Sequence, residues 1–353
     1  MTIRAILSVY SMKQVVLVQH AIGEVGLDNF GVIDLVLPEL KDGEYLIENI
    51  YCGTDPYMRI SMNPGEVFPN YPMITLNEGI PGESVGRVIE SKNADFPIHT
   101  HLWHKKGWRT HAIGNSDTEH FKLTPGTDME KYLTFYSLVG RTAYYSLTKV
   151  LKVNVSDTVG VSGATGGVGN MVVQFANLMG CTVYGLTSTQ EKADLVNELG
   201  GTGVVVPRKT PLMKMRAIIS GACEPFDAYH ENVGNDYFFS ALQNMTYSGT
   251  MSYCGVMSLY QNIVPSGGPN LFALTTKDIT IRGCNMTKDL VYGSEEWKQQ
   301  FNWTDEFHQF INDHIDELQC VNTMYEGIES MPQQFVDHFT PKTPRSGKSL
   351  CRI

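Results

Sequence analysis

The sequence predicts an α/β protein built from two domains. Three observations support this: an amino-terminal part with short β-like runs, a central part in which strands and helices alternate, and a glycine-rich turn between the first such strand and helix. At 353 residues the chain is long enough for two domains. Its composition, 42% hydrophobic and 18% charged, is typical of a chain with a substantial core.

The first 137 residues are predicted to form a mostly β domain. "YLIENIYC" (45–52) and "SVGRVIES" (84–91) are typical strands, and segments such as "NPGEVFPNYP" interrupt them with turn residues. The carboxyl-terminal stretch returns to short mixed elements, which we expect to rejoin this domain.

From Leu138 onward, strand and helix patterns alternate, which predicts a parallel sheet with crossover helices. The strand candidates are "DTVGVSGA", "CTVYGLTS", "GVVVP", "FDAYHENVG", "GTMSYCGV" and "DITIRGCN". "NMVVQFANLMG" and "QEKADLVNELGG" are predicted helices that end at glycines, as helices often do. Residues 294–316 predict a long amphipathic helix.

The glycine-rich turn lies in "VGVSGATGGVGN" (159–170). Ala164, Gly166 and Gly169 have the spacing of a dinucleotide-binding fingerprint, with alanine in the first place. A strand before the turn and a helix after it supply the context that the fingerprint requires. Backbone can approach a pyrophosphate at Gly166, and the helix N-terminus favours phosphate. We therefore predict a Rossmann, doubly wound sheet, with a plain tight turn as the alternative interpretation.

The residues after the second strand favour NADP over NAD. An NAD site usually places Asp or Glu about 20 residues beyond the glycines. Thr187 and Ser188 occupy that region here, and neither would repel a 2′-phosphate. Lys192 follows, and Arg208 lies just past the third strand; each can pair with the phosphate. The alternative is that both are solvated surface charges.

The stretch "YCGTDPYMR" (51–59) resembles the start of a catalytic zinc site, but the other ligands are missing. Gly82 stands before Glu83 where a histidine ligand would be expected, and residues 91–137 contain no cysteine. Cys52 is therefore interpreted as a small buried residue. A histidine-rich stretch follows at His99, His101, His104, His111 and His120. We interpret it as a solvated loop rather than a metal site, and predict no metal.

Charge and cysteine usage disfavour several other classes of protein. The net charge of −10 disfavours a nucleic-acid-binding protein, which normally needs a basic surface. The seven cysteines are scattered and include no CxxC, so a disulfide framework is not expected. The amino terminus lacks a clean signal-peptide core, and no uninterrupted apolar span is long enough for a membrane helix. We expect a soluble cytoplasmic protein.

Several stretches together resemble a known family. They are "DPYMR" (55–59), "VIESKN" (88–93), "GWRTHAI" (107–113), "GATGGVGN" (163–170), "ENVG" (231–234), "CGVMSLY" (254–260) and "GIESMPQQF" (327–335). They span nearly the whole chain and are similar to the zinc-independent medium-chain dehydrogenase/reductases. The nearest group is that of prostaglandin reductases (leukotriene B4 12-hydroxydehydrogenases) and plant NADPH-dependent double-bond reductases.

The resemblance implies a GroES-like catalytic domain at 1–137 and 317–353, and a Rossmann NADPH-binding domain at 138–316. It implies a tyrosine beside the nicotinamide and substrate oxygen at Tyr260, an aromatic near the substrate at Tyr57, and a nicotinamide contact at Thr142. Arg345 stands where the family has a cofactor-contacting asparagine. The other implied cofactor positions are Gly166, Gly167, Val168, Gly169, Lys192, Arg208, Asn232, Cys254, Gly255, Cys284, Asn285 and Met286.

Some positions depart from the family pattern. Arg208 replaces a tyrosine, which should preserve phosphate binding, whereas Leu138, Val139 and Arg141 alter the segment near the nicotinamide. Members of the family often pair edge strands into homodimers, and "DITIRGCNM" is the candidate strand here.

The implied activity is NADPH-dependent reduction of the C=C bond of an α,β-unsaturated ketone or aldehyde, of the 15-oxoprostaglandin 13-reductase or 2-alkenal reductase type. Hydride would reach the β-carbon, and Tyr260 would assist the enolate; the alternative for Tyr260 is a cleft-lining aromatic. Three other functions stay open: an NADPH quinone reductase, a non-catalytic, crystallin-like or RNA-binding NADPH-binding protein, and an alcohol dehydrogenase with unusual zinc ligands. Neither the physiological substrate nor the source of the α-carbon proton, Tyr260 or water, follows from the sequence.

Overall fold

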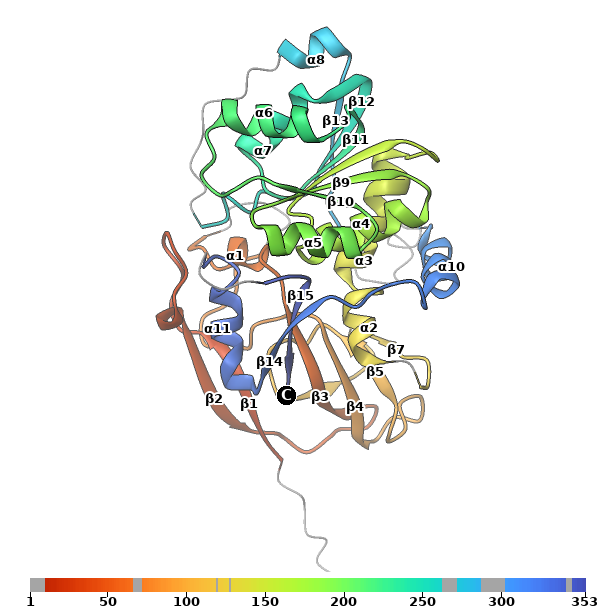
Figure 1. Ribbon diagram of the computed structural model, residues 1–353. Coiled ribbons are helices and arrows are strands. Elements are labelled where there is room, and N and C mark those ends of the chain that lie inside the picture. Colours follow the sequence, from red (N-terminus) through yellow and green to blue (C-terminus); the bar gives the residue numbers. More distant parts are fainter. Residues whose placement is uncertain are drawn as a thin grey trace, which may run out of the picture. The chain divides into compact units, whose positions relative to one another are not determined.

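The computed structural model describes residues 10–65, 72–118, 120–126, 128–261, 272–286, 302–340 and 345–353. The chain divides into two compact units (Figure 1). The first unit comprises Met1–Tyr132, Met324–Thr340 and Leu350–Ile353, and the second unit comprises Leu133–Thr323 and Pro341–Ser349. The predicted domain boundaries differ from these units by a few residues at each crossing. They also differ at 341–349, which belongs to the second unit, whereas the predicted first domain includes it.

The second unit contains a six-stranded parallel sheet. In chain order its strands are β8 (Thr158–Ser162), β9 (Thr182–Thr187), β10 (Thr202–Val205), β11 (Phe226–Glu231), β12 (Met245–Tyr253) and β13 (Thr280–Gly283). Their order in the sheet is β10-β9-β8-β11-β12-β13, and every neighbouring pair is parallel. The strand order reverses at β8, as in a Rossmann fold, so the predicted fold class is confirmed.

Helices cover both faces of this sheet. They are α3 (Leu138–Tyr145), the π-helical η2 (Ser146–Leu151), α4 (Gly167–Leu178), α5 (Gln190–Glu198), α6 (Leu212–Ala222), α7 (Asp236–Gln243), α8 (Phe272–Lys277) and α10 (Thr304–His314). Ala228 and Tyr229 are consecutive on β11, and each belongs to a different buried cluster. Because successive side chains of a strand point to opposite faces, the two clusters lie on the two sides of the sheet. Both faces are therefore buried, which explains the nearly continuous apolar runs of these strands.

The first unit is mostly β, as expected. Its strands are β1 (Ser11–Leu17), β2 (Phe30–Val36), β3 (Tyr45–Thr54), β4 (Ser84–Ser91), β5 (His101–His104), β6 (His111–Gly114), β7 (His120–Lys122), β14 (Asn322–Glu326) and β15 (Lys348–Arg352). β1 and β2 form an antiparallel pair; the larger sheet has the order β14-β15-β3-β4-β5-β7, and β6 pairs with β3. Short helices complete the unit: η1 (Leu27–Asn29), α1 (Met58–Ser61), α2 (Met129–Thr134), η3 (Ile328–Ser330) and α11 (Met331–Val336). Two residues each of α2, β14 and β15 belong to the second unit.

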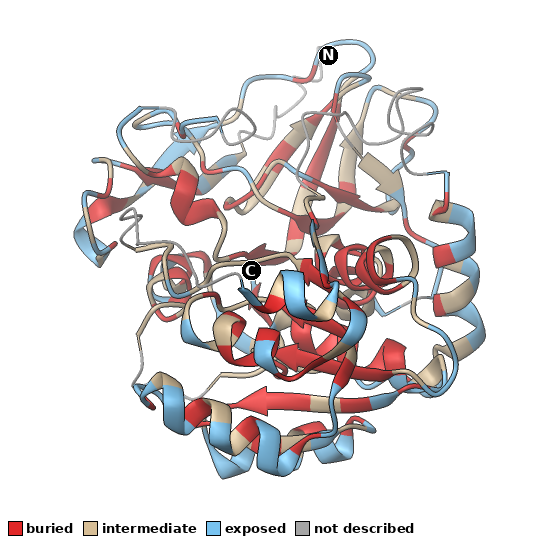
Figure 2. Ribbon diagram, turned by 90° about the horizontal axis from the view of Figure 1, so that it is seen from above, coloured by how far each residue is buried: buried red, intermediate tan, exposed pale blue. Residues whose placement is uncertain are grey.

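Burial follows the sheets of both units. Figure 2 shows buried residues along many strands and on one side of several helices, with exposed residues on the other side. In the first unit one cluster joins Trp108, Phe30 and Cys52 to Phe335 of α11. The carboxyl-terminal segment therefore contributes to the amino-terminal core, as the sequence predicted.

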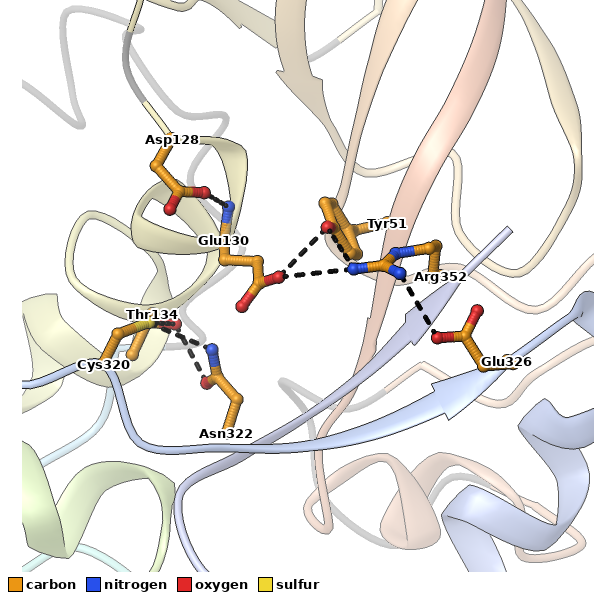
Figure 3. A network of polar contacts seen from close by, with 8 residues as sticks. All are labelled: Tyr51, Asp128, Glu130, Thr134, Cys320, Asn322, Glu326 and Arg352. Atoms are coloured by element: carbon orange, nitrogen blue, oxygen red, sulfur yellow. Dashed lines mark hydrogen bonds and ion pairs between the residues drawn. The ribbon is translucent and has the colours of Figure 1, made fainter.

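Figure 3 shows polar contacts near the ends of the chain segments that make up each unit. In the first unit, Tyr51 donates a hydrogen bond to Glu130 at 3.0 Å, and Arg352 of β15 donates to the Tyr51 hydroxyl at 3.3 Å. In the second unit, the Thr134 hydroxyl donates to Asn322 Oδ1 at 3.0 Å. This bond joins the segments by which the chain enters and leaves the second unit.

The predicted strands and the two glycine-stopped helices are confirmed within a few residues. The amphipathic helix predicted for 294–316 falls partly outside the described residues; its described part forms α10. Over the residues that the structure describes, no helix is both long and apolar enough to cross a bilayer. β13 ends the six-stranded sheet at one edge, and dimerisation through it stays a prediction.

Candidate dinucleotide site

The glycine-rich turn joins β8 to α4. Gly166 is the N-cap of α4, with extended backbone (φ −73°, ψ 174°), and it is exposed, while Gly167 and Val168 are partly exposed. A Cβ atom at Gly169 would lie 2.2 Å from the carbonyl oxygen of Gly163, so only glycine fits there. The start of a twelve-residue helix is thus left open to an anion.

The end of β11 fixes the other side of this turn. Asn232 uses its backbone N–H to bind the Ser162 hydroxyl and its side-chain amide to bind the Ser162 carbonyl, both at 2.8 Å. Buried Glu231 accepts hydrogen bonds from the backbone N–H groups of Val233 and Gly234. The predicted cofactor residue Asn232 therefore lies directly beside the end of β8.

Three cations gather where the sequence predicts the 2′-phosphate. Lys192 lies in the first turn of α5, just after the end of β9, and Arg208 follows β10. Burial lowers the pKa of Lys192, and the positive charges of Arg208 and then Arg345 lower it further. Both arginines are therefore within electrostatic range of Lys192, and this group of three cations is suited to a multiply charged anion.

Arg345 reaches this cluster because 345–347 returns to the glycine turn. The backbone N–H of Gly347 donates to the Thr165 carbonyl at 2.7 Å, and Gly347 bridges to Gly166. Gly347 has φ +74°, and a Cβ there would lie 1.7 Å from the Val321 carbonyl oxygen. Glycine is therefore required at 347, and it places Arg345 next to the fingerprint.

A cavity of about 190 Å³ lies between α5 and this returning segment. Its lining residues are Glu191, Lys192, Asn322, Thr323, Arg345 and Ser346. Of these, only Lys192 and Arg345 were predicted. The other four have no sequence signal of their own. Thr323 of β14 and Ser346 meet through a hydrogen bond from the Thr323 hydroxyl to the Ser346 carbonyl at 2.8 Å, a non-local pairing that depends on tertiary structure.

The segment after β12 carries the predicted Cys254, Gly255 and Tyr260. It is tied to the loop after β11: Met257 and Ser258 donate backbone hydrogen bonds to the carbonyls of Asn232 and Val233 at 3.1 and 3.0 Å. Tyr260 is partly exposed. The structure thus brings Tyr260 to the same end of the sheet as the glycine turn, where Rossmann folds bind ligands.

The remaining predicted cofactor residues lie at two places in the second unit. Cys284, Asn285 and Met286 follow β13, and the latter two are partly exposed. Thr142 is buried on α3, and its hydroxyl donates to the Leu138 carbonyl at 2.6 Å. Its hydroxyl is thus engaged within its own helix, so any nicotinamide contact by Thr142 stays a prediction.

Tyr57 belongs to the first unit. It is the N-cap of α1, is partly exposed, and packs against the buried cluster around Trp108. Arg59 of the same motif is buried, and its guanidinium donates to the carbonyls of Ala21 and Gly23 at 3.1 and 2.6 Å. The "DPYMR" motif therefore anchors the short helix that presents Tyr57.

The residues around Cys52 do not fit a zinc ion. Cys52 is fully buried, its thiol donates to the Gly107 carbonyl at 3.6 Å, and it accepts from the Ser84 hydroxyl at 3.3 Å. A Cβ at Gly82 would lie 3.1 Å from Trp108 Nε1, which leaves little room for a histidine. Among the described residues, no three His, Cys, Asp or Glu side chains are grouped as metal ligands.

The histidine-rich stretch is dispersed over several strands. His104 is buried, contrary to the solvated loop we expected; burial lowers its pKa to about 3, and Nε2 lies 2.8 Å from Asn49 Oδ1. His120 instead contacts the Thr118 carbonyl and the Tyr45 hydroxyl. These two histidines therefore serve the packing of the β-sheet.

Comparisons with known proteins agree with this geometry. Residues 13–123 match the family described as the N-terminal domain of oxidoreductases, and residues 167–306 match the zinc-binding dehydrogenase family. The chain is 32% identical over 336 residues to prostaglandin reductase 1 of Bos taurus, covering 92% of this chain and 94% of the relative. The chain belongs to the prostaglandin reductase family of medium-chain dehydrogenases/reductases. It is accordingly an oxidoreductase.

The chain is also similar to other proteins. The NADP(+)-dependent 2-alkenal reductase of Nicotiana tabacum is 31% identical over 284 residues, covering 77% of this chain and 80% of the relative. Among solved structures, CurA of Vibrio vulnificus in complex with NADPH has a TM-score of 0.82 at 24% identity, covering 96% and 98% of the two chains. At that identity the structural likeness establishes the shared two-domain fold alone.

Proposed function

We propose that this protein uses NADPH to reduce the C=C bond of an α,β-unsaturated ketone or aldehyde. The observation that carries the proposal is the cluster of Lys192, Arg208 and Arg345 beside the fingerprint turn. Within its family, relatives at 31–32% identity are named prostaglandin reductase and NADP(+)-dependent 2-alkenal reductase. The cations favour a dinucleotide with a 2′-phosphate, and the relatives' names favour the reaction class.

The chain's own residues would bind the dinucleotide along the carboxyl ends of the strands. The open N–H groups at Gly167 and Val168 would face the pyrophosphate, and the three cations would pair with the 2′-phosphate. Asn232, the segment from Cys254 to Tyr260, and the residues from Cys284 to Met286 would orient the nicotinamide end. When bound, NADPH supplies a hydride.

Tyr260 would act on the substrate oxygen. As hydride reaches the β-carbon, negative charge develops on the carbonyl oxygen, and a phenol can donate a hydrogen bond to that oxygen. Loss of one such donor typically costs about 10²–10³ in rate. The α-carbon then takes a proton, from the phenol or from water. Tyr57 would supply an aromatic contact to the substrate.

The proposal is tested by following NADPH oxidation with a 15-keto-prostaglandin, a 2-alkenal and a quinone in parallel. We expect turnover on one or both enones with the saturated carbonyl compound as product. Faster turnover on the quinone would instead support a quinone reductase. Stoichiometric NADPH binding without turnover on any enone would support a non-catalytic binding protein.

A further inference from the structure

Two cysteines stand opposite each other at the ends of neighbouring strands. β12 and β13 are paired so that Tyr253 lies opposite Gly283, and Cys254 and Cys284 are the next residues on each strand. The Cys284 N–H donates to the Tyr253 carbonyl at 3.0 Å, so the pairing continues to this point. Adjacent strands lie about 4.8 Å apart, which is within the Cα separation that a disulfide spans. Opposite residues of a parallel pair also project from the same face.

The surroundings make the two thiols chemically unequal. Hydrogen bonds from Cys254, and also from Ser252 and Ser146, lower the pKa of Cys284 against the opposing effect of burial. The hydrogen bond to Cys284 and burial raise the pKa of Cys254. Cys284 is buried with 4% of its surface exposed, whereas Cys254 is partly exposed. Cys254 is therefore the more exposed residue of the pair, and Cys284 has the thiol with the lower pKa.

Three buried polar side chains, Ser146, Ser252 and His230, form hydrogen bonds with one another next to this cysteine pair. Ser146 Oγ lies 2.8 Å from Ser252 Oγ and 2.7 Å from Nδ1 of His230. All three side chains are fully buried, and burial lowers the pKa of His230 to about 4, so its ring is neutral near pH 7. Hydrogen bonds from these hydroxyls lower the pKa of Cys284, as does the positive charge of Arg282, while His230 adds no charge.

The other cysteines lack this combination of features. Cys52, Cys181, Cys223 and Cys351 are buried, and burial raises the pKa of each thiol. Cys320 is exposed but lies against Thr134 and Asn322, with no second cysteine in those contacts. All seven cysteines are free thiols in this structure.

We propose that Cys254 and Cys284 form a dithiol modification site that reacts with low-molecular-weight disulfides to give an intramolecular disulfide. Cys254 loses its proton to solvent and attacks one sulfur of the small disulfide; a bond forms between the two sulfurs, the small disulfide bond breaks, and the first small thiolate leaves and takes up a proton from solvent. Cys284 then loses its proton and attacks the Cys254 sulfur, and the second small thiolate leaves and takes up a proton. Two protein thiols are oxidised to one disulfide, and the small disulfide is reduced to two thiols.

The test treats the reduced full-length protein with oxidised glutathione, alkylates the remaining thiols and maps the peptides by non-reducing mass spectrometry. We expect a peptide pair cross-linked through Cys254 and Cys284. The Cys284→Ser variant should instead accumulate glutathione on Cys254, whereas Cys254→Ser should leave Cys284 unmodified. The matched control Cys320→Ser should retain the cross-link. Recovery of both cysteines alkylated in wild type, or cross-linking that persists in either cysteine variant, overturns the proposal.

A second probe covers the case in which a variant does not fold. Phenylarsine oxide bridges two adjacent thiols, so the wild-type protein should bind one equivalent and then resist cross-linking by oxidised glutathione. Absence of this protection overturns the proposal. Saturating NADPH should slow the modification, because both cysteines lie in segments that we propose contact the cofactor. This last effect alone rests on the proposed function; the cross-link itself is measured without NADPH.

Discussion

Lys192 shows how one residue combines local structure with function. Its backbone N–H donates to the Thr189 hydroxyl at the start of α5, and its ammonium group lies near two arginines. Lys192 and Arg208 could be singled out from the sequence because they follow two successive strands of a Rossmann pattern. Arg345 was assigned to the cofactor only by resemblance. Its proximity to Lys192 depends on a chain return that no local pattern encodes.

The lowered pKa of Lys192 predicts a pH-dependent preference for NADPH. Lys192 attracts the 2′-phosphate only while protonated, so this attraction is present below its pKa and lost as the pH rises through it. We expect the Kd for NADPH to begin to rise at a lower pH than it would with a lysine of ordinary pKa, while the Kd for NADH stays nearly constant. Titrations of cofactor fluorescence at several pH values measure both constants.

The matched variant for this prediction is Lys192→Arg, whose guanidinium keeps its charge over the same range. The Kd of this variant for NADPH should depend little on pH. The Lys192→Ala variant should have a Kd for NADPH that is tenfold or more higher than wild type, because a charge-assisted contact contributes about 1.5–3 kcal/mol. If Lys192→Ala raised the Kd for NADH as much as the Kd for NADPH, this would contradict the assignment of Lys192 to the 2′-phosphate.

Tyr260→Phe tests the proposed donor to the substrate oxygen. The substitution keeps the ring and removes the hydroxyl, so kcat on an enone should fall by about 10²–10³ while the Kd for NADPH changes little. Steady-state kinetics and cofactor titration give the two quantities separately. Equal losses in both would mean that Tyr260 serves cofactor binding or folding instead.

At the scale of elements, the glycine turn between β8 and α4 was predictable in detail because each requirement is local. A strand, a tight turn, a close helix–strand approach and a helix start follow one another within twelve residues of sequence (159–170). The pairing of β12 with β13 is harder to predict from the sequence. Both strands could be predicted, but the register that sets Cys254 opposite Cys284 depends on packing of the whole sheet.

Gly169→Ala should damage this turn specifically. Its Cβ would meet the backbone of Gly163 at 2.2 Å and Ala164 Cα at 3.0 Å, and overpacking of this kind costs about 1–3 kcal/mol. We expect a lower melting temperature and at least tenfold weaker NADPH binding. Gly221→Ala on α6 is the matched control, because apart from its own helix backbone no heavy atom lies within 4 Å of its Cβ position; stability there should be unchanged or slightly increased. Equal effects of the two substitutions would rule out the close approach.

At the scale of the whole molecule, the chain passes from one compact unit to the other and back more than once. The sequence predicted both domains and the contribution of the carboxyl-terminal segment to the first core. It did not predict that 341–349 belongs to the second unit, because Gly347 bridges to Gly166 across 180 residues of sequence. Such non-local pairings are set by tertiary structure and leave little trace in a single sequence.

Cofactor binding should therefore change amide hydrogen exchange mainly in the second unit. All residues proposed to contact the dinucleotide belong to it. Saturating NADPH should slow amide hydrogen exchange at 163–170, 254–260 and 345–347, and NADH should do so less at 345–347. Mass-spectrometric exchange on the full chain measures this. Protection confined to the first unit would contradict the proposed site.

The central claim, hydride transfer from NADPH to the β-carbon of an enone, is tested most directly by isotope transfer. The wild-type enzyme is supplied with an enone and NADPH deuterated at its transferable C4 position, and the product is examined by nuclear magnetic resonance. The account predicts one deuterium at the β-carbon of the saturated carbonyl compound. Deuterium at the carbonyl carbon of an alcohol product, or no consumption of NADPH with any enone, would contradict it.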